Sequence, residues 1–189
     1  MRLTRLAIGD LVEVQPARHG DARGYFSEIF KRSAFEAEGI RIDWIQDNQA
    51  FSAEAGTVRG LHFQRPPHAQ DKLIRALRGA IFDVAVDIRD GSPTYGRWVG
   101  VELSAEQGNQ LLVPAGFAHG YMTLQPDTEV LYKVSAPYAP ADEMAIRWDD
   151  PDIGIDWPDL GVAPVLSGKD KVAPFLIDHV PVFAYRDSR

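Results

Sequence analysis

Residues 57–88 read TVRGLHFQRPPHAQDKLIRALRGAIFDVAVDI and contain three short apolar runs, separated by turn signals at residues 65–68 and 78–79. This spacing is typical of consecutive antiparallel strands. Polar and apolar residues alternate, which indicates strands that pack one face on a core and turn the other toward water. Because the polar positions carry mainly titratable groups, we predict a barrel with a pocket inside it. These positions are Arg59, His62, Gln64, Lys72, Arg75, Asp83 and Asp87.

The length and the ends of the chain favour one domain. A chain of 189 residues is long enough for one sizeable core and short for two. We therefore expect a single domain over residues 1–189, with the last ten residues as a tail. No apolar run is long enough to cross a bilayer. Residues 1–10 lack the apolar segment of a signal peptide, so we expect a cytoplasmic protein without a membrane association.

The composition excludes several classes of function. The absence of cysteine rules out disulfides, thiolate nucleophiles and cysteine-based zinc sites. A net charge of −7 argues against a general nucleic-acid binder, which needs a basic face. We therefore expect small-molecule partners, with any anionic ligand held by a local group of Arg and Lys side chains.

The rest of the chain continues the strand pattern and gives the fold class. Many short strands with regular turns and little helix predict an all-β sandwich or barrel with short flanking helices. We expect a turn-rich loop at residues 19–24 and pairing of the last two strands around residues 125–127. A short helix is expected over residues 31–38, with Ser33 as N-cap and Gly39 as its stop, and another within residues 170–178, limited by Pro174. The further strands are predicted at residues 11–15, 24–30, 43–51, 97–103, 109–113, 117–124 and 129–135.

One feature of the first predicted strand conflicts with a shared pocket. In strict alternation, Arg59 and His62 lie on opposite faces. A bulge at Gly60 would bring both to the same side.

A metal site is the first chemistry that a barrel with inward histidines suggests. It would need three or four His, Asp or Glu ligands at short spacing. The chain offers His62 with His119 as a second imidazole, and Lys72 stands where a ligating acid is expected. We therefore expect neither a metal nor another cofactor.

Acid–base chemistry fits the same residues better. His62 can act as a general base near neutral pH, oriented by Asp83 or Asp170. Lys72 can stabilise an enolate oxygen if it points inward. The alternatives are a core histidine bonded to the backbone and a solvated edge lysine. Tyr132 alternates with core valines and can donate a proton, although a buried tyrosine is more often a packed ring.

Other residues are candidates for holding a ligand. The side-chain amides of Gln46, Asn48 and Gln49 either form hydrogen bonds with backbone groups or bind a ligand. Phe26 and Tyr138 can stack on a base or simply pack. A phosphorylated ligand could be bound by a cluster of cations formed by Arg23, Arg59, Lys169 and Lys171. The alternative is that these side chains are ordinary surface charges.

Several motifs follow one another in order along the chain, from about residue 11 to residue 174. The motifs are Asp21-x-Arg23-Gly24-x-Phe26-x-Glu28, Gln46-Asp47-Asn48, Val58-Arg59-Gly60-Leu61-His62-Phe63-Gln64, Asp83-Val84-x-Val86-Asp87-Ile88-Arg89, Val113-Pro114-x-Gly116-Phe117-x-His119-Gly120, Tyr132-Lys133, Tyr138 with Glu143, and Ser167-x-Lys169-Asp170. Together they resemble the motifs of the dTDP-4-dehydrorhamnose 3,5-epimerase family, a cupin-like jelly-roll family.

The resemblance implies a reaction and roles. The family inverts carbons 3 and 5 of dTDP-4-keto-6-deoxyglucose without metal. By similarity, His62 is the base oriented by Asp170, Lys72 faces the oxyanion, and Tyr132 returns a proton to the opposite face. The resemblance also implies a homodimer with ligand contacts crossing between subunits, and a substrate site that includes Arg23, Phe26, Glu28, Gln46, Asp47, Asn48, Arg59, Lys72, His119, Tyr138, Glu143 and Lys169.

Three alternatives remain open at this point. A related enzyme can epimerise one carbon only, or act on another nucleotide sugar, because sequence does not give the placement of the acid relative to the ring. A metal-dependent cupin would need more ligands than the chain offers. A non-catalytic sugar-binding cupin would have no need for Tyr132 opposite His62.

Overall fold

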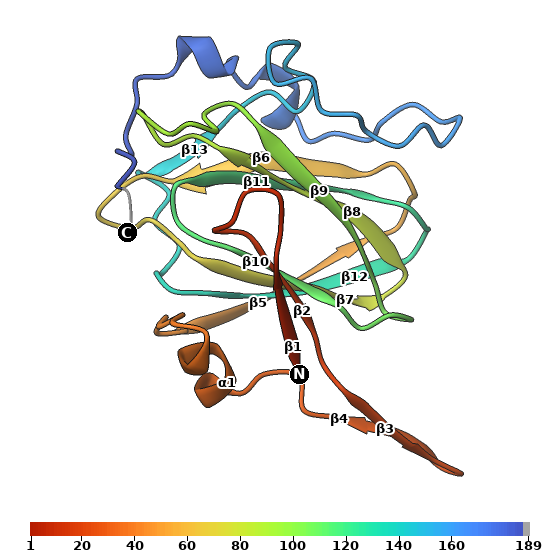
Figure 1. The fold of residues 1–189 in the computed structure, drawn as a ribbon. Helices are drawn as coiled ribbons and strands as arrows, with labels where there is room; N and C mark the ends of the chain where they lie inside the picture. The colour runs from red at the N-terminus through yellow and green to blue at the C-terminus, as the bar shows by residue number, and fades with distance from the viewer. Residues whose placement is uncertain (187–189) are drawn as a thin grey trace.

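Two antiparallel sheets form most of the protein in the computed structural model, which describes residues 1–186 (Figure 1). The six-stranded sheet runs in the order β1 (Arg2–Arg5), β2 (Val12–Gln15), β10 (Gln110–Val113), β7 (Lys72–Arg78), β12 (Thr128–Val134) and β5 (Gln46–Ser52). The five-stranded sheet runs in the order β13 (Glu143–Ala145), β6 (Val58–Gln64), β11 (Phe117–Thr123), β8 (Ala80–Asp87) and β9 (Trp98–Ser104). The predicted all-β, cupin-like jelly-roll fold with short flanking helices is confirmed.

The pairing of consecutive strands differs from the prediction. β6 and β8 lie in the five-stranded sheet, whereas β7, between them in sequence, lies in the six-stranded sheet. β11 and β12 are likewise in different sheets, so the predicted pair around residues 125–127 was wrong. Turn residues specify a change of direction, but they do not specify whether the next strand stays in the same sheet. As a result, side chains of β6 and β7 meet across the interior instead of side by side.

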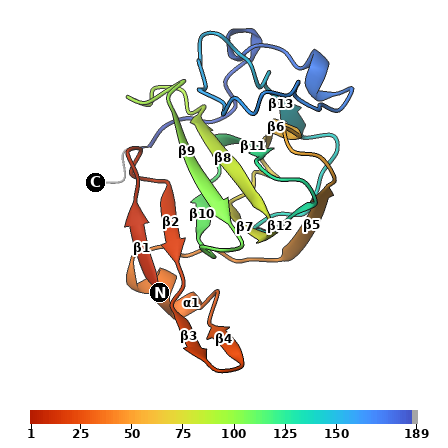
Figure 2. The same cartoon turned by 90° about the vertical axis from the view of Figure 1, so that its right-hand side faces the viewer.

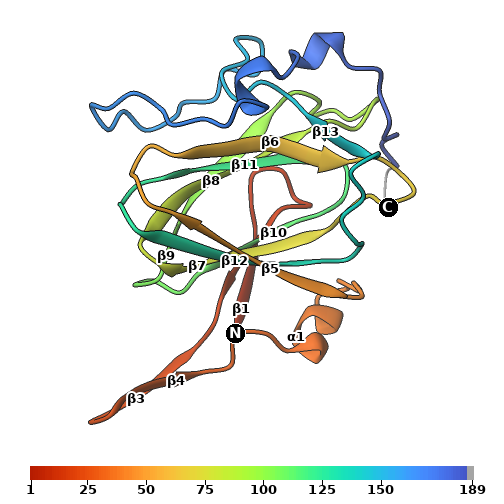
Figure 3. The same ribbon diagram turned by 180° about the vertical axis from the view of Figure 1, so that it is seen from behind.

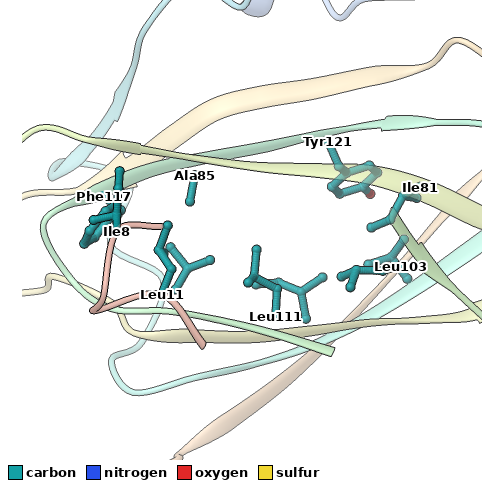
Figure 4. Close-up of a cluster of buried hydrophobic side chains, with 11 residues drawn as sticks. Ile8, Leu11, Ile81, Ala85, Leu103, Leu111, Phe117 and Tyr121 are labelled. Atoms are coloured by element: carbon teal, nitrogen blue, oxygen red, sulfur yellow. The ribbon is translucent and has the colours of Figure 1, made fainter. Parts of the chain in front are cut away.

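A hydrophobic cluster fills part of the space between the two sheets (Figure 4). Inward positions alternate with outward ones along each strand, as the period of two requires. Each fully buried Leu or Ile contributes on the order of 2 kcal/mol through removal of its surface from water. The buried members are Ile8, Leu11, Ile74, Ile81, Ala85, Leu103, Leu111, Val113, Phe117, Tyr121 and Val130.

Both sheets are also covered on their outer faces. The helix α1 (Arg32–Ala37) lies against the outer side of the six-stranded sheet (Figure 3), and its Phe35 packs with Leu73 and Leu112 of that sheet. The chain after β13 crosses the outer face of the five-stranded sheet, where Ile146 and Ile153 pack with Leu61 and other residues (Figure 1). This C-terminal layer matters for the site because it brings residues 165–170 next to β6.

The N-terminal region contains elements that the sequence did not predict. β1 is polar and pairs with β2. The predicted loop at residues 19–24 was wrong, because β3 (Arg18–Asp21) and β4 (Gly24–Ser27) form a hairpin that projects from the barrel (Figure 2). β4 ends at Ser27 rather than at residue 30. The helix is confirmed, but its N-cap is Lys31 without a side-chain bond, not Ser33.

The C-terminal region also departs from the prediction. Two short 3₁₀ turns, η1 (Asp170–Val172) and η2 (Leu176–Asp178), replace the single expected helix, consistent with the break that Pro174 imposes. Residues 180–186 are not a loose tail, because Ala184 forms a bridge with Asp90 and Phe183 packs on Phe63. Residues 187–189 of the predicted tail lie outside the described residues. No helix among residues 1–186 has the length and apolar character needed to cross a membrane.

Candidate active site

Two adjoining chambers are lined by strands of both sheets. The larger has a volume of about 490 Å³ and the smaller about 160 Å³. Both are lined by His62, Lys72 and Tyr132, so these three side chains stand where the chambers meet. The predicted interior pocket is therefore present, and the three acid–base candidates converge on it.

An irregularity in β6 brings Arg59 and His62 to the same cavity. His62 lies opposite His119 of β11 and Arg59 lies opposite Tyr121, so β6 advances by three residues while β11 advances by two. Gly60, within this irregularity, has a φ of +138°, and a Cβ there would lie 2.5 Å from the Cα of Gly120. The predicted bulge at Gly60 is confirmed, since Arg59 and His62 both line the larger chamber.

Asp170 is the carboxylate that contacts His62. Its Oδ1 lies 2.6 Å from Nε2 of His62, and Ser167 Oγ donates to its Oδ2 at 2.8 Å. Burial raises the pKa of Asp170, but hydrogen bonding and charge from His62 outweigh burial, and the net pKa is lowered. A carboxylate bound to Nε2 fixes the tautomer of the ring and leaves Nδ1 to take up a proton. Of the two carboxylates considered from the sequence, the structure selects Asp170.

Lys72 lies on β7 with its ammonium turned into the cavity. It is buried, and its Nζ lies 3.4 Å from the backbone oxygen of His62. Burial lowers the pKa of Lys72 to about 8, with the charges of Asp83 and Glu143 opposing this shift. A buried ammonium in a site of low dielectric is well suited to stabilising a developing oxyanion.

Tyr132 approaches the cavity from the opposite sheet to His62. It lies on β12, next to β7, whereas His62 lies on β6 of the five-stranded sheet. Burial raises the pKa of Tyr132, so its phenol stays protonated at neutral pH. A base on one side of a bound ring and a proton donor on the other are what inversion of a carbon requires.

His119 and Asp83 form a second pair next to the first. Nε2 of His119 lies 2.7 Å from Oδ1 of Asp83, and both residues are buried. Burial lowers the pKa of His119, so the imidazole is neutral at pH 7. Asp83 is therefore the hydrogen-bond partner of His119 and not of His62. Among residues 1–186, no three His, Asp or Glu side chains gather as a metal ion would require.

The smaller chamber gathers several of the predicted ligand-binding residues. Gln46 donates to Asn48 at 2.7 Å, and both line this chamber together with Tyr138 and Glu143. Glu143 Oε2 accepts hydrogen bonds from Lys169 Nζ at 2.6 Å and from Tyr138 Oη at 3.0 Å. These groups offer an aromatic face, amides and one cation at the cavity mouth.

Comparison with known proteins places this geometry in a family. The family model for dTDP-4-dehydrorhamnose 3,5-epimerase matches residues 5–178. This chain belongs to that family. The protein is accordingly an epimerase.

Family members with curated names and with solved structures match this chain over most of its length. A dTDP-4-dehydrorhamnose 3,5-epimerase of Sinorhizobium fredii is 52% identical over 98% of this chain and 94% of its own. An epimerase structure from Legionella pneumophila, in complex with dTDP-4-keto-L-rhamnose, superposes with a TM-score of 0.93 at 41% identity and covers 98% of both chains. A 3'-monoepimerase of Streptomyces bikiniensis, in complex with dTDP-quinovose, is 39% identical with a TM-score of 0.85, covering 91% of this chain and 86% of its own.

Some predicted binding residues of this epimerase do not line its own cavity. Arg23 and Phe26 belong to the hairpin of β3 and β4, which projects from the barrel (Figure 1). The side chain of Arg23 is 90% exposed and Phe26 is 72% exposed. Arg23 pairs with Asp21 of the same hairpin, and Glu28 lies just beyond it, 3.6 Å from Lys31. Of the four cations expected to form one cluster, Arg59 and Lys169 line the larger chamber of the chain, whereas Arg23 and Lys171 do not.

Three further residues of the epimerase point away from the cavity or are occupied elsewhere. Asp47 pairs with Lys133 at 3.0 Å on the other face of β5 from Gln46 and Asn48. Gln49 donates to Glu129, so this amide is used within the protein. Lys171 lines neither chamber.

Sequence reasoning gave no role to two residues that the structure brings to the site. Ser167 holds Asp170, and Tyr121 lines the larger chamber beside His119. Tyr121 is two residues from His119, so the alternation of side chains along a strand places both on the same face. This spacing could have predicted that Tyr121 lies at the site. Ser167 appears in a family motif, but only its contact with Asp170 reveals its role.

Proposed function

We propose that the protein inverts carbons 3 and 5 of dTDP-4-dehydro-6-deoxy-D-glucose to form dTDP-4-dehydro-L-rhamnose, a step of dTDP-L-rhamnose biosynthesis. The observation that carries this proposal is the convergence of His62, Lys72 and Tyr132 from opposite sheets on one cavity. The curated relatives with this activity match nearly the whole chain and support the choice of substrate.

The proposed mechanism follows from the positions of these groups. His62 removes a proton from the carbon next to the 4-keto group, while Asp170 stabilises the imidazolium that forms. The electrons move onto the keto oxygen, and Lys72 stabilises the resulting enolate. Tyr132 then donates a proton to the opposite face of the same carbon. His62 then releases its proton to solvent and the phenolate of Tyr132 takes one up, which restores both groups for the same cycle at the second carbon.

We place the sugar in the larger chamber, against His62 and Tyr132, and the nucleotide toward the smaller chamber. Arg59 is tethered by hydrogen bonds to Ser52 Oγ at 3.2 Å and to the Phe51 oxygen at 3.0 Å, which fixes a cation for the diphosphate. Tyr138 is 56% exposed beside Glu143 and offers a stacking face for thymine.

The proposed assembly is a cytoplasmic homodimer of single-domain chains. The hairpin of β3 and β4 carries Arg23 and Phe26 away from the chain's own barrel, which suits a contact with the cavity of a second copy. β5 is also an edge strand with Phe51 52% exposed, and an exposed edge favours pairing with another chain.

The test is proton NMR of the protein with dTDP-4-keto-6-deoxyglucose in heavy water. We expect deuterium at both carbon 3 and carbon 5, and a rhamno product when a 4-ketoreductase is added. Deuterium at one carbon only would favour the second candidate, a single-site epimerase, which the likeness to the Streptomyces bikiniensis monoepimerase supports. Binding without any exchange would contradict both.

A further inference from the structure

Asp83 is a buried carboxylate that the proposed mechanism does not use. It has no exposed surface, and Oδ1 is bonded to Nε2 of His119. Its Oδ2 is buried and lacks a hydrogen-bond partner among residues 1–186. A buried charge with an empty acceptor is unfavourable unless an opposite charge compensates it. The position of Asp83 therefore calls for a cation nearby.

The other carboxylates around the cavity have partners of their own. Asp170 is bonded to His62 and Ser167, and Glu143 is bonded to Lys169. The single partner of Asp83 among the described residues is His119, and burial lowers the pKa of this imidazole and keeps it neutral. The negative charge of Asp83 is thus not balanced by its own hydrogen-bond partner.

Lys72 is the matching cation. Its ammonium is buried and lies within salt-bridge distance of no carboxylate in the described part of the chain. Burial lowers the pKa of Lys72 to about 8, and Asp83 is the larger of the two negative charges that oppose this effect, ahead of Glu143. Lys72 and Asp83 come from different sheets, on β7 and β8, and Lys72 lines the larger chamber together with His119, the partner of Asp83.

We propose that Asp83 is a positioning residue whose buried charge keeps Lys72 protonated, with neutral His119 separating the carboxylate from the substrate. A carboxylate in direct contact with the cavity would repel the enolate that Lys72 stabilises. His119 lines the cavity in front of Asp83 and removes that conflict. This inference deepens the proposed function, since it rests on the role of Lys72 there.

Two titratable groups near Lys72 respond to the charge of Asp83, but neither gains a charge when that carboxylate is removed. Asp83 opposes the lowering of the pKa of His119, so the loss of Asp83 lowers this pKa further and the imidazole stays neutral. Burial is the main cause that raises the pKa of Tyr121, with Asp83 a smaller one, so this phenol stays neutral as well. The other titratable groups on the cavity wall are Arg59, His62, Tyr132, Glu143, Lys169 and Asp170. A change in the titration of Lys72 in an Asp83 variant can therefore be assigned to the carboxylate.

The direct test is a ¹⁵N NMR titration of the Lys72 Nζ in the full-length protein, with Lys72→Met for assignment. In Asp83→Asn, we expect the midpoint of Lys72 to fall by about one pH unit, as loss of a partly screened charge predicts. The alkaline limb of kcat/KM should move by the same amount. The matched control is Asp87→Asn. Asp87 lies on the same strand, is equally buried, and is held by Arg89, Ser92 and Thr94, so its loss should leave the midpoint of Lys72 unchanged.

A measurement on the unmodified protein covers the case in which Asp83→Asn does not fold. The ¹³C signal of the Asp83 carboxyl carbon should shift with the midpoint of Lys72, because the two charges are coupled. An unchanged Lys72 midpoint in Asp83→Asn, an equal shift in Asp87→Asn, or an Asp83 signal insensitive to the Lys72 titration would overturn the inference. If the titrations behave as expected but the substrate is not epimerised, only the proposed function fails.

Discussion

The two His–Asp pairs of the cavity lie side by side and differ in exposure. His62 and His119 face each other in register across β6 and β11. The side chain of His62 is 28% exposed and that of His119 is 9% exposed. Asp170 comes from the C-terminal layer and is held by Ser167, whereas Asp83 comes from the adjacent strand and has one oxygen without a partner.

This difference in exposure indicates that two pairs of the same composition, each a histidine with an aspartate, serve two different purposes. An imidazole open to the cavity, with a fully bonded carboxylate behind it, can accept and release a proton. The buried imidazole of His119 stays neutral instead. It separates the cavity from the negative charge of Asp83, which acts on Lys72. We therefore interpret the first pair as catalytic and the second as positioning.

The largest expected effect comes from removing the open imidazole. His62→Ala should lower turnover by about 10³-fold, because a general base contributes roughly 10²–10⁴. Deuterium exchange at both carbons should be lost while circular dichroism remains native. His119→Ala should lose much less exchange. Comparable exchange losses in the two variants would contradict the difference between the pairs.

Asp170→Asn tests the carboxylate of the open pair. We expect turnover to fall by about 10²-fold, since the imidazolium loses its counter-charge but the base remains. KM should change little, because the Asp170 carboxylate is held by His62 and Ser167 through its two oxygens. Steady-state kinetics separate the two quantities. A rise in KM with unchanged kcat would place Asp170 in binding instead.

The pH dependence tests the positioning pair. Lys72 is an ammonium below its pKa of about 8 and neutral above it. Stabilisation of the enolate is thus present at neutral pH and is lost as the pH rises through 8. We expect an alkaline limb of kcat/KM with a midpoint near pH 8, falling about tenfold per pH unit beyond it. A flat profile up to pH 10 would contradict this role.

The smallest effect is expected outside the two pairs, on the hairpin. Arg23→Ala should leave the melting temperature unchanged, because the side chain is 90% exposed and its ion pair with Asp21 is on the surface. In the proposed dimer, KM should rise about tenfold, because the ligand in the cavity of the second copy would lose one charge-assisted contact. Asp21→Ala removes the same ion pair and should leave KM near its normal value.

The sequence predicted the strands better than their arrangement. Alternation located most strands, and the glycine at position 60 predicted the bulge that aligns Arg59 with His62. Alternation would also have placed Asp47 on the opposite face from Gln46 and Asn48, as found. Pairing between sheets was not predictable, because local turn chemistry does not specify which sheet a strand joins. β1 was missed because its four residues are mostly polar.

The pairing of His62 with its carboxylate required the fold. From the residues alone, Asp83 and Asp170 were both possible, and the contact with Asp170 spans 108 positions. Such long-range contacts depend on how the C-terminal layer crosses the sheet. The resemblance to a family named Asp170 as the partner of His62, and the two side chains are in contact. It also implied ligand contacts that cross between subunits, but it did not single out Arg23, Phe26 and Glu28 as the residues outside the chain's own cavity.

The most direct test of opposite-face proton delivery is Tyr132→Phe followed in heavy water. We expect His62 still to remove protons, so deuterium enters the substrate while inversion falls by about 10²-fold or more. The NMR spectrum then shows labelled starting material of unchanged configuration. Inversion at the wild-type rate would contradict the role of Tyr132, because the proton donor would then be another group.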